Sequence, residues 1–132
     1  MSIDQQQLID AAKSVRKHAH APYSGFFVGV AVQDENGNMY TGCNVENASF
    51  PEGCCAEAVA IGSMVAAGGR KIVGIAAVGG PDELVHCAPC GGCRQRIREF
   101  ADENTEIIYR NADGDFDNVG IDDLLPSSFS LK

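Results

Sequence analysis

Three cysteines and one glutamate have the types and the spacing of a metal-dependent catalytic site. Cys90 and Cys93 lie three residues apart, and Cys55 comes two residues before Glu57. Two thiols at that spacing on the first turn of a helix can point at one ion, and a third thiol from another element completes three ligands. Three protein ligands leave one position open, which is typical of catalytic zinc sites. The offset of Glu57 from Cys55 suits a neighbour of the metal better than a ligand.

These cysteines lie at the starts of two predicted helices. One helix is expected from about Cys55 to Ala67, where Gly68-Gly69 ends it, and the other from about Cys90 to Phe100. The partial positive charge and the free N–H groups at a helix N-terminus favour thiolate over thiol. Since metal binding needs the thiolate, both helix starts suit a metal site.

The remaining elements indicate a layered α/β domain. Helical periodicity, alternating apolar residues and turn residues mark them. They are a helix over Ile3–His20, strands over Val28–Val32 and Met39–Cys43 joined at Asn36-Gly37, strands over Ile72–Val78 and Glu106–Tyr109, and a helical turn over Ile121–Leu125. The strand–helix–strand alternation in the middle of the chain predicts some parallel pairing.

The size and charge of the chain limit its partners. Its 132 residues suit a single domain over residues 1–132. With 18 acidic and 10 basic side chains, its net charge of −8 disfavours nucleic acid and anionic membranes, because cations supply most of the affinity for phosphates. The longest uncharged run, His18–Gln33, is too short and too interrupted to span a bilayer, and the first residues do not resemble a signal peptide. We expect a cytoplasmic protein.

The sequence around the cysteines resembles the zinc-dependent cytidine deaminases, which share a glutamate that is not a ligand and a Pro-Cys-x-x-Cys segment. The matching motifs are Cys55-Ala56-Glu57 and Pro89-Cys90-Gly91-Gly92-Cys93-Arg94-Gln95. Segments 22–26, 42–50 and 124–129 also resemble family motifs in the same order. The resemblance covers nearly the whole chain, and it implies a three-layer α/β/α domain with a mixed central sheet.

The resemblance also implies roles for individual residues. Cys55, Cys90 and Cys93 would bind one zinc ion per subunit, and Glu57 would move protons. Family active sites are completed across the subunits of a tetramer, so a homotetramer is implied. The implied substrate contacts are Asn44 and Glu46 to the ribose, the backbone around Ala56 to the pyrimidine edge, and Phe26 beside the nucleoside. Phe50 and Phe129 would be aromatic contributions to the shared sites, with Phe129 on the base from a neighbouring subunit.

The implied activity is the hydrolytic deamination of cytidine and 2′-deoxycytidine to uridine and 2′-deoxyuridine with release of ammonia, a step of pyrimidine salvage. Two alternatives stay open. One is deamination of another aminopyrimidine nucleoside such as blasticidin S, and the other is a zinc-stabilised module without catalysis. The segment Asn44-Val45-Glu46-Asn47 resembles a ribose-binding motif and favours cytidine.

One departure from the family pattern concerns charge. Many relatives have Arg-Thr after Cys-Ala-Glu, where this chain has Ala58-Val59. A divalent cation with three thiolates carries a net negative charge, which opposes the ionisation of a bound water. We hypothesise that the two helix N-termini, helped by Arg94, moderate this charge.

Several residues also have simpler explanations. The other three cysteines, Cys43, Cys54 and Cys87, are expected to be buried or half-buried thiols, with only one of the adjacent Cys54 and Cys55 facing the metal. His86 fits a loop histidine bonded to backbone or water. Taken alone, Asn44 and Glu46 would pass for turn residues, and the three phenylalanines named above for core residues.

Overall fold

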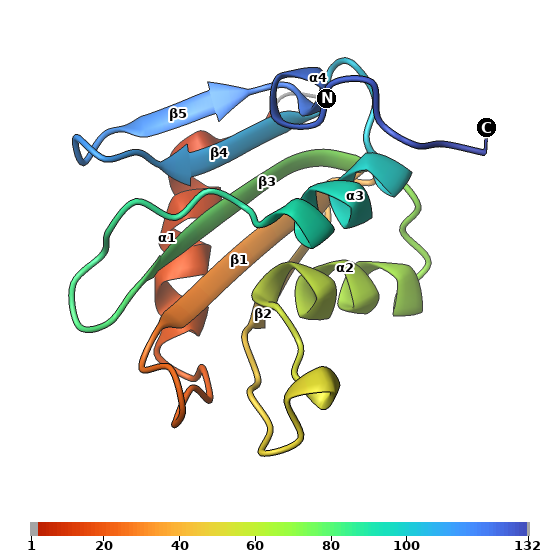
Figure 1. The fold of residues 1–132 in the computed structure, drawn as a ribbon. Helices are drawn as coiled ribbons and strands as arrows, with labels where there is room; N and C mark the ends of the chain where they lie inside the picture. The colour runs from red at the N-terminus through yellow and green to blue at the C-terminus, as the bar shows by residue number, and fades with distance from the viewer. Residues whose placement is uncertain (1–2, 132) are drawn as a thin grey trace.

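The computed structural model describes residues 3–131, and a mixed five-stranded sheet is at its centre (Figure 1). The strand order is β2-β1-β3-β4-β5, with β3 and β4 parallel and the other neighbours antiparallel. The strands are β1 (Phe27–Asp34), β2 (Met39–Cys43), β3 (Ile72–Gly80), β4 (Glu106–Arg110) and β5 (Phe116–Val119). The helices are α1 (Gln5–Arg16), α2 (Ala56–Ala66), α3 (Gly91–Phe100) and α4 (Ile121–Leu124), with a 3-10 turn η1 (Phe50–Glu52).

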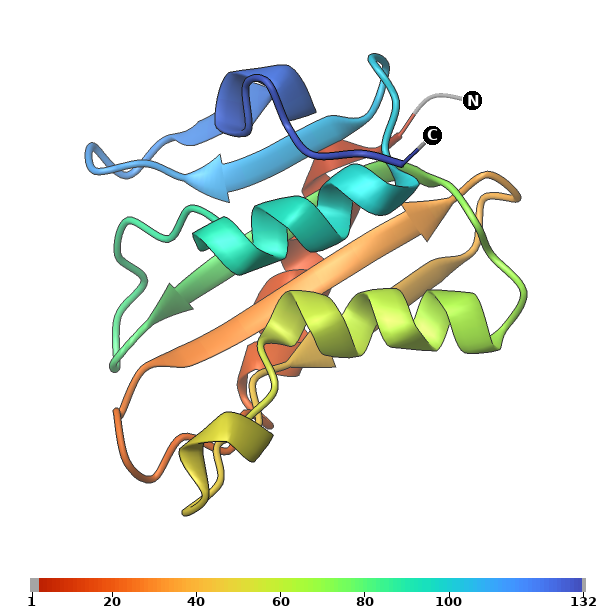
Figure 2. The same cartoon turned by 45° about the vertical axis from the view of Figure 1, so that its right-hand side comes forward.

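Helices cover both faces of the sheet, which confirms the predicted three-layer α/β/α arrangement. Helix α1 lies on one face, and α2 and α3 lie side by side on the other (Figures 1 and 2). Each face has its own apolar core. Leu8 and Ala12 of α1 pack with Ile108 on the first face. The core of the opposite face includes Ala60, Met64, Ile75 and Ile97.

Helix α1 is shorter than the predicted Ile3–His20. It begins after Asp4, whose side chain accepts a hydrogen bond from the Gln7 amide at 3.1 Å, a typical N-cap contact. It ends at Arg16 because the following backbone pairs elsewhere. The amide of His20 donates to the Asn44 carbonyl at 3.0 Å, and the amide of Glu46 donates to the His20 carbonyl at 2.8 Å. These bonds place segment 17–26 beside the loop that follows β2.

The predicted hairpin of β1 and β2 is confirmed, and it positions α2. The buried Asp34 carboxylate accepts from the Asn36 and Asn38 amides, each at 2.9 Å, and so closes the turn. On β2, a Cβ added at Gly42 would lie 2.4 Å from the Ala60 nitrogen. Gly42 therefore lets α2 pack directly against β2, which sets the height at which α2 begins.

Helices α2 and α3 begin where they were predicted to, within one residue. Cys55 is the N-cap residue of α2 and Cys90 is that of α3, both with extended backbone angles. Helix α2 ends at a left-handed Gly68 with φ of 101°, and the Gly69 amide then donates to the Met64 carbonyl at 2.9 Å. The two N-cap cysteines consequently face each other across the same side of the sheet.

The sequence patterns did not predict β5. Its residues Phe116–Val119 carry an Asp and an Asn, and they form an edge strand because they pair with β4 in antiparallel register. The predicted helical turn at Ile121–Leu125 is confirmed as α4. Among residues 3–131, none of the helices combines the length and the apolar character that a membrane crossing requires.

Candidate metal centre and active site

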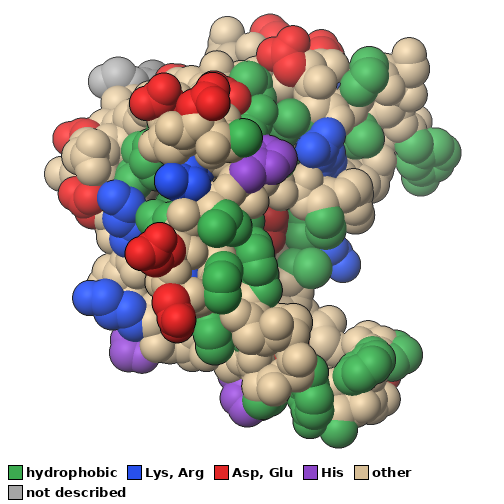
Figure 3. Space-filling model, turned by 60° about the vertical axis from the view of Figure 1, so that its left-hand side comes forward, with side chains coloured by type: hydrophobic (Ala, Val, Ile, Leu, Met, Phe, Trp, Pro, Cys, Tyr) green, Lys and Arg blue, Asp and Glu red, His purple; other side chains and the backbone are tan. Residues whose placement is uncertain are grey.

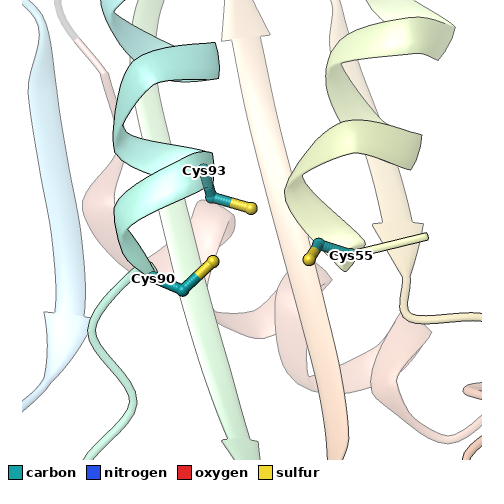
Figure 4. Close-up of side chains that lie close together, drawn as sticks. All are labelled: Cys55, Cys90 and Cys93. Atoms are coloured by element: carbon teal, nitrogen blue, oxygen red, sulfur yellow. The ribbon is translucent and has the colours of Figure 1, made fainter. Parts of the chain in front are cut away.

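Cys55, Cys90 and Cys93 come together at the N-termini of α2 and α3. All three sulfur atoms lie within 4.8 Å of one another, and Figure 4 shows them pointing toward a common space between the two helices. Cys93 is buried, Cys55 is half-buried and Cys90 is exposed. Within the described residues, this is the only group of three His, Cys, Asp or Glu side chains close enough to hold a metal ion.

The cluster fits a zinc ion. A tetrahedral zinc with Zn–S bonds of about 2.3 Å holds its sulfur ligands roughly 3.8 Å apart, which is compatible with the observed spacing. Thiolate sulfur is also a donor that zinc prefers. The three sulfurs leave the fourth position of a tetrahedron without a protein ligand, as predicted for a catalytic site.

The surroundings act differently on the three thiols. Burial is the main cause that raises the pKa of Cys55, and it raises the pKa of Cys93 strongly. The pKa of Cys90 is lowered, chiefly by the backbone N–H of Cys93 in the first turn of α3. The expected effect of a helix N-terminus therefore holds for Cys90, but it is wrong for Cys55, where burial outweighs it and raises the pKa. A bound cation would supply the charge that the other two thiols need to ionise.

Glu57 lies in the first turn of α2, next to the cluster. Its side chain is only 5% exposed, and this burial raises the pKa of its carboxyl group. A raised pKa means that the carboxyl group holds a proton more readily than an exposed carboxyl group does. Glu57 does not belong to the group of potential metal ligands, and its place beside the ion stays a prediction.

A small cavity joins the cysteine cluster to three of the predicted contact residues. It has a volume of about 200 Å³, which is below the range of roughly 300–1,000 Å³ usual for ligand sites. The lining residues are Phe26, Val28, Asn44, Cys55, Ala56, Glu57, Cys87, Ala88 and Cys90. One subunit therefore brings the predicted metal ligands and Glu57 together, in a site that is small for a drug-sized molecule.

Asn44 is held in one orientation by the start of β1. Its Oδ1 accepts from the Val28 amide and its Nδ2 donates to the Phe26 carbonyl, both at 2.8 Å. An amide side chain has one further N–H and one further lone pair available after these two bonds. Asn44 therefore supports the backbone of β1 and can still form hydrogen bonds within the cavity.

Glu46 and Phe50 line a second cavity, of about 390 Å³, together with Tyr23, Ser24, Asn47 and Gly53. The Glu46 carboxylate accepts from the Tyr23 amide at 3.0 Å and from the Ser24 amide at 3.1 Å, and the Ser24 hydroxyl also donates to it. These bonds, led by that of the Ser24 hydroxyl, lower the pKa of Glu46. Glu46 is therefore an ionised group that organises the turn after residue 22.

Exposed aromatic rings surround this second cavity. Phe50 is 75% exposed and Tyr23 is 55% exposed, and their rings meet edge to face at 6.0 Å. Figure 3 shows hydrophobic side chains gathered on the lower projection of the molecule and along the hollow above it. Large aromatic side chains that project into solvent together are typical of an interaction surface.

Phe129 lies away from both cavities. It is 69% exposed and lines a third cavity with residues of the last turn of α3 and with Asp102. The cysteines lie at the opposite end of that ten-residue helix, so the fold does not bring Phe129 to the metal site of its own chain. The exposure of Phe50 and Phe129 excludes the simpler explanation that they are core residues.

Arg94, which we expected to moderate the charge of the metal site, has other partners. Its side chain donates to the Pro89 carbonyl at 2.7 Å and to the Leu124 carbonyl at 3.0 Å. The arginine that reaches the cluster is Arg96, whose Nη1 lies 3.3 Å from the Cys93 sulfur. The sequence contained a signal for this contact, because Arg96 follows Cys93 at the i,i+3 spacing that places two side chains on one helix face.

The remaining cysteines and His86 are not in the cluster. Cys43 and Cys87 are half-buried, as expected, but Cys54 is exposed, so the expectation of burial is wrong for it. Cys54 and Cys55 diverge as predicted, since only Cys55 joins the cluster. His86 stacks edge to face with Tyr109 at 6.2 Å. Cys87, whose pKa burial raises to about 11, lines the cavity, a placement that its spacing alone did not indicate.

Comparisons with known proteins agree with this geometry. Residues 2–109 match the family model of the cytidine and deoxycytidylate deaminase zinc-binding region. The chain is 38% identical over 130 residues to a cytidine deaminase of Sporosarcina psychrophila, covering 98% of this chain and 94% of that one. A cytidine deaminase of Halalkalibacterium halodurans is 37% identical over 130 residues, covering 98% and 97% of the two chains.

Solved structures show the same relationship. The crystal structure of a cytidine deaminase from Burkholderia pseudomallei superposes with a TM-score of 0.86 at 42% identity, covering 96% of this chain and all of the other. That of a cytidine deaminase from Mycobacterium tuberculosis superposes with a TM-score of 0.85 at 32% identity, covering 98% and 100% of the two chains.

Proposed function

This chain belongs to the cytidine and deoxycytidylate deaminase family, and from that premise we propose that it deaminates cytidine and 2′-deoxycytidine through Glu57 and a zinc ion held by Cys55, Cys90 and Cys93. The enzyme is a zinc-dependent hydrolase that converts cytidine and water into uridine and ammonia. The observation that carries the assignment of residues is the cluster of three thiols beside a cavity that Cys55, Cys90 and the buried Glu57 line.

The chemistry divides between the metal and the protein. A bound zinc ion with an open position supplies a Lewis acid that lowers the pKa of water toward neutrality. Glu57 accepts a proton from the attacking water, delivers it to N3 of the pyrimidine, and passes a proton to the departing amino group. Its burial supports both directions of transfer, because the carboxyl group holds a proton more readily than an exposed one.

The nucleoside contacts are proposed from the residues around the cavity. Asn44 keeps one N–H and one lone pair for a ribose hydroxyl, and its amide is already oriented by Phe26 and Val28. Ala56 is the first residue of α2, so its N–H has no partner within the helix and can bind the pyrimidine edge. Phe26 would pack beside the nucleoside. Glu46 would accept a bond from the ribose, although most of its lone pairs already serve Tyr23 and Ser24.

We further propose that the active unit is a homotetramer in which neighbouring chains complete each site. The cavity around the metal centre is small, and Phe50 and Phe129 are exposed and line other cavities. In this arrangement, Phe129 of one subunit stacks on the base held by another. The acidic charge of −8 suits a free nucleoside rather than a nucleic-acid strand. Six free cysteines suit a reducing compartment, which supports action in the cytoplasm in pyrimidine salvage.

The test of this proposal is an absorbance assay on three substrates. Purified protein with a measured zinc content is incubated with cytidine, 2′-deoxycytidine and blasticidin S, and the loss of the aminopyrimidine absorbance is followed. We expect turnover of the first two at one zinc per chain. Turnover of blasticidin S alone would assign the chain to another nucleoside, and zinc binding without turnover of any substrate would leave a structural module.

A further inference from the structure

Arg96 is directed at the metal centre from the exposed side of α3. Its Nη1 lies 3.3 Å from the Cys93 sulfur, within hydrogen-bonding distance of sulfur. Cys93 itself is fully buried. Arg96 follows Cys93 by one turn of α3, so the helix holds the guanidinium above the sulfur. The exposed Arg96 side chain thus contacts the buried sulfur of Cys93.

The two neighbouring arginines of α3 have other partners. Arg94 donates to the carbonyls of Pro89 and Leu124, and Arg98 donates to the Ser128 hydroxyl at 2.9 Å. All three carry the same charge and the same donor geometry. The contact with sulfur therefore distinguishes Arg96, and Arg98 offers a matched comparison on the same helix.

A cation beside Cys93 would stabilise the metal centre when zinc is bound. When zinc binds, it displaces the protons of three thiols, and the neutral group of thiols becomes a group with a net negative charge. The surrounding chain is acidic, with a net charge of −8, and the buried Glu57 adjoins the cluster. A nearby guanidinium stabilises the zinc-loaded state relative to the protonated empty state, because only the loaded state is negative.

We propose that Arg96 is a positioning residue of the metal centre, which donates a hydrogen bond to the Cys93 thiolate, offsets the negative charge of the loaded site and strengthens its hold on zinc. The inference rests on the proposed assignment of Cys55, Cys90 and Cys93 as zinc ligands. Groups that hydrogen-bond to a metal ligand typically change metal affinity by about 10- to 100-fold. Because the Arg96 side chain is exposed, we expect the lower end of that range, about tenfold.

The experiment compares wild type, Arg96→Gln, Arg96→Lys and Arg98→Gln in two measurements without substrate. The first is zinc transfer to a coloured chelator at neutral pH. The second is the sulfur-to-metal charge-transfer absorption of the cobalt-substituted protein, which reports the electron density on the thiolates. We expect Arg96→Gln to weaken zinc binding about tenfold and to move the absorption to lower energy, since Cys93 loses a donated hydrogen bond.

Arg98→Gln removes the same charge from the same helix but not the contact with sulfur, so it should match wild type in both measurements. Arg96→Lys separates two causes of the Arg96 contribution to zinc affinity. If the variant keeps the wild-type zinc affinity, the charge is the cause, and if the affinity falls, the planar donor geometry is the cause. Wild-type zinc affinity and absorption in Arg96→Gln, or an equal change in Arg98→Gln, would overturn the role of Arg96. A wild-type protein whose cobalt form lacks thiolate absorption would instead overturn the proposed ligands, and the inference with them.

Discussion

Under the proposed function, Glu46 and Asn44 would each support the fold and contact the substrate. Asn44 binds the backbone at the start of β1, and Glu46 binds the turn that carries Tyr23 and Ser24. Both therefore hold the segment that places Phe26 at the cavity. Replacing either residue would disturb this segment and the nucleoside contact together, so a change in a supporting residue is more informative.

Ser24→Ala tests the contribution of Glu46 through its ionisation. The Ser24 hydroxyl is the main cause that lowers the pKa of Glu46. Without it the pKa rises, the carboxylate takes up a proton at a higher pH, and the ribose contact is lost earlier as the pH falls. The acid limb of the pH profile of kcat/KM for cytidine should therefore move to higher pH. Ser63→Ala, on the exposed side of α2, is the control and should leave the profile unchanged.

At the residue scale, the sequence predicted the cysteine cluster but not the arginine beside it. The cysteines and Glu57 were predictable because few residue types bind zinc or carry protons, and their spacing is restrictive. Arg96 was not distinguished from Arg94, because Arg96 lies at i,i+3 from Cys93 and Arg94 lies at the equally suitable i,i+4 spacing from Cys90. Only the packing of α3 decides which of them meets a sulfur atom.

At the scale of elements, the site depends on how closely α2 packs against β2. The backbone of α2 at Ala56 and Ala60 lies so close to Gly42 of β2 that Gly42 has no room for a side chain. Cys55 is the N-cap residue of this helix and Glu57 lies in its first turn, so a shift of α2 would move a proposed ligand and the proposed proton carrier together.

Gly42→Ala should destabilise the fold and slow the reaction. The new Cβ would lie 2.4 Å from the Ala60 nitrogen and 2.7 Å from the Ala56 carbonyl oxygen, so α2 must move. We expect a loss of about 1–3 kcal/mol in the free energy of unfolding in urea, with a lower kcat. Gly62→Ala is the matched control in α2, because its Cβ meets nothing within 4 Å. It should stabilise the protein by about 0.5–1 kcal/mol, and a Gly42→Ala protein as stable as wild type would contradict this packing.

The order of helices and strands was mostly predictable, and the exceptions have a common cause. The starts of α2 and α3 lie at their N-cap cysteines, and the end of α2 lies at a glycine with positive φ. These signals are local in the sequence. The early end of α1 and the existence of β5 depend instead on distant partners, the bridge from His20 to Val45 and the pairing with β4. Periodicity within a segment carries no information about such partners.

At the scale of the whole molecule, the proposed contact residues lie in three separate cavities. Phe26 and Asn44 lie with the metal centre, Glu46 and Phe50 in the second cavity, and Phe129 in the third. One chain therefore does not gather the predicted set of contacts. Association of several chains is the simplest arrangement that would bring exposed rings to a neighbour's metal centre.

Mixing two inactive variants tests this arrangement. Glu57→Gln lacks the proton carrier, and Phe129→Ala lacks the stacking ring. If each site combines Glu57 of one chain with Phe129 of another, hybrids formed by refolding equal amounts should regain activity at about a quarter of their sites. The solution mass should be close to four times 13.9 kDa. Hybrids with no recovery, or an active monomer, would contradict shared sites.

The most direct test of the account is the rate of cytidine deamination by zinc-loaded wild type and zinc-loaded Glu57→Gln, with zinc measured in the same samples. The substituted glutamine side chain is nearly isosteric with glutamate but cannot carry the proton. The variant should therefore hold one zinc per chain and lose about 10²- to 10⁴-fold or more in kcat. The loss of cytidine absorbance over time gives both rates. Near-normal turnover by a zinc-replete Glu57→Gln protein, or no turnover by zinc-replete wild type, would contradict the account.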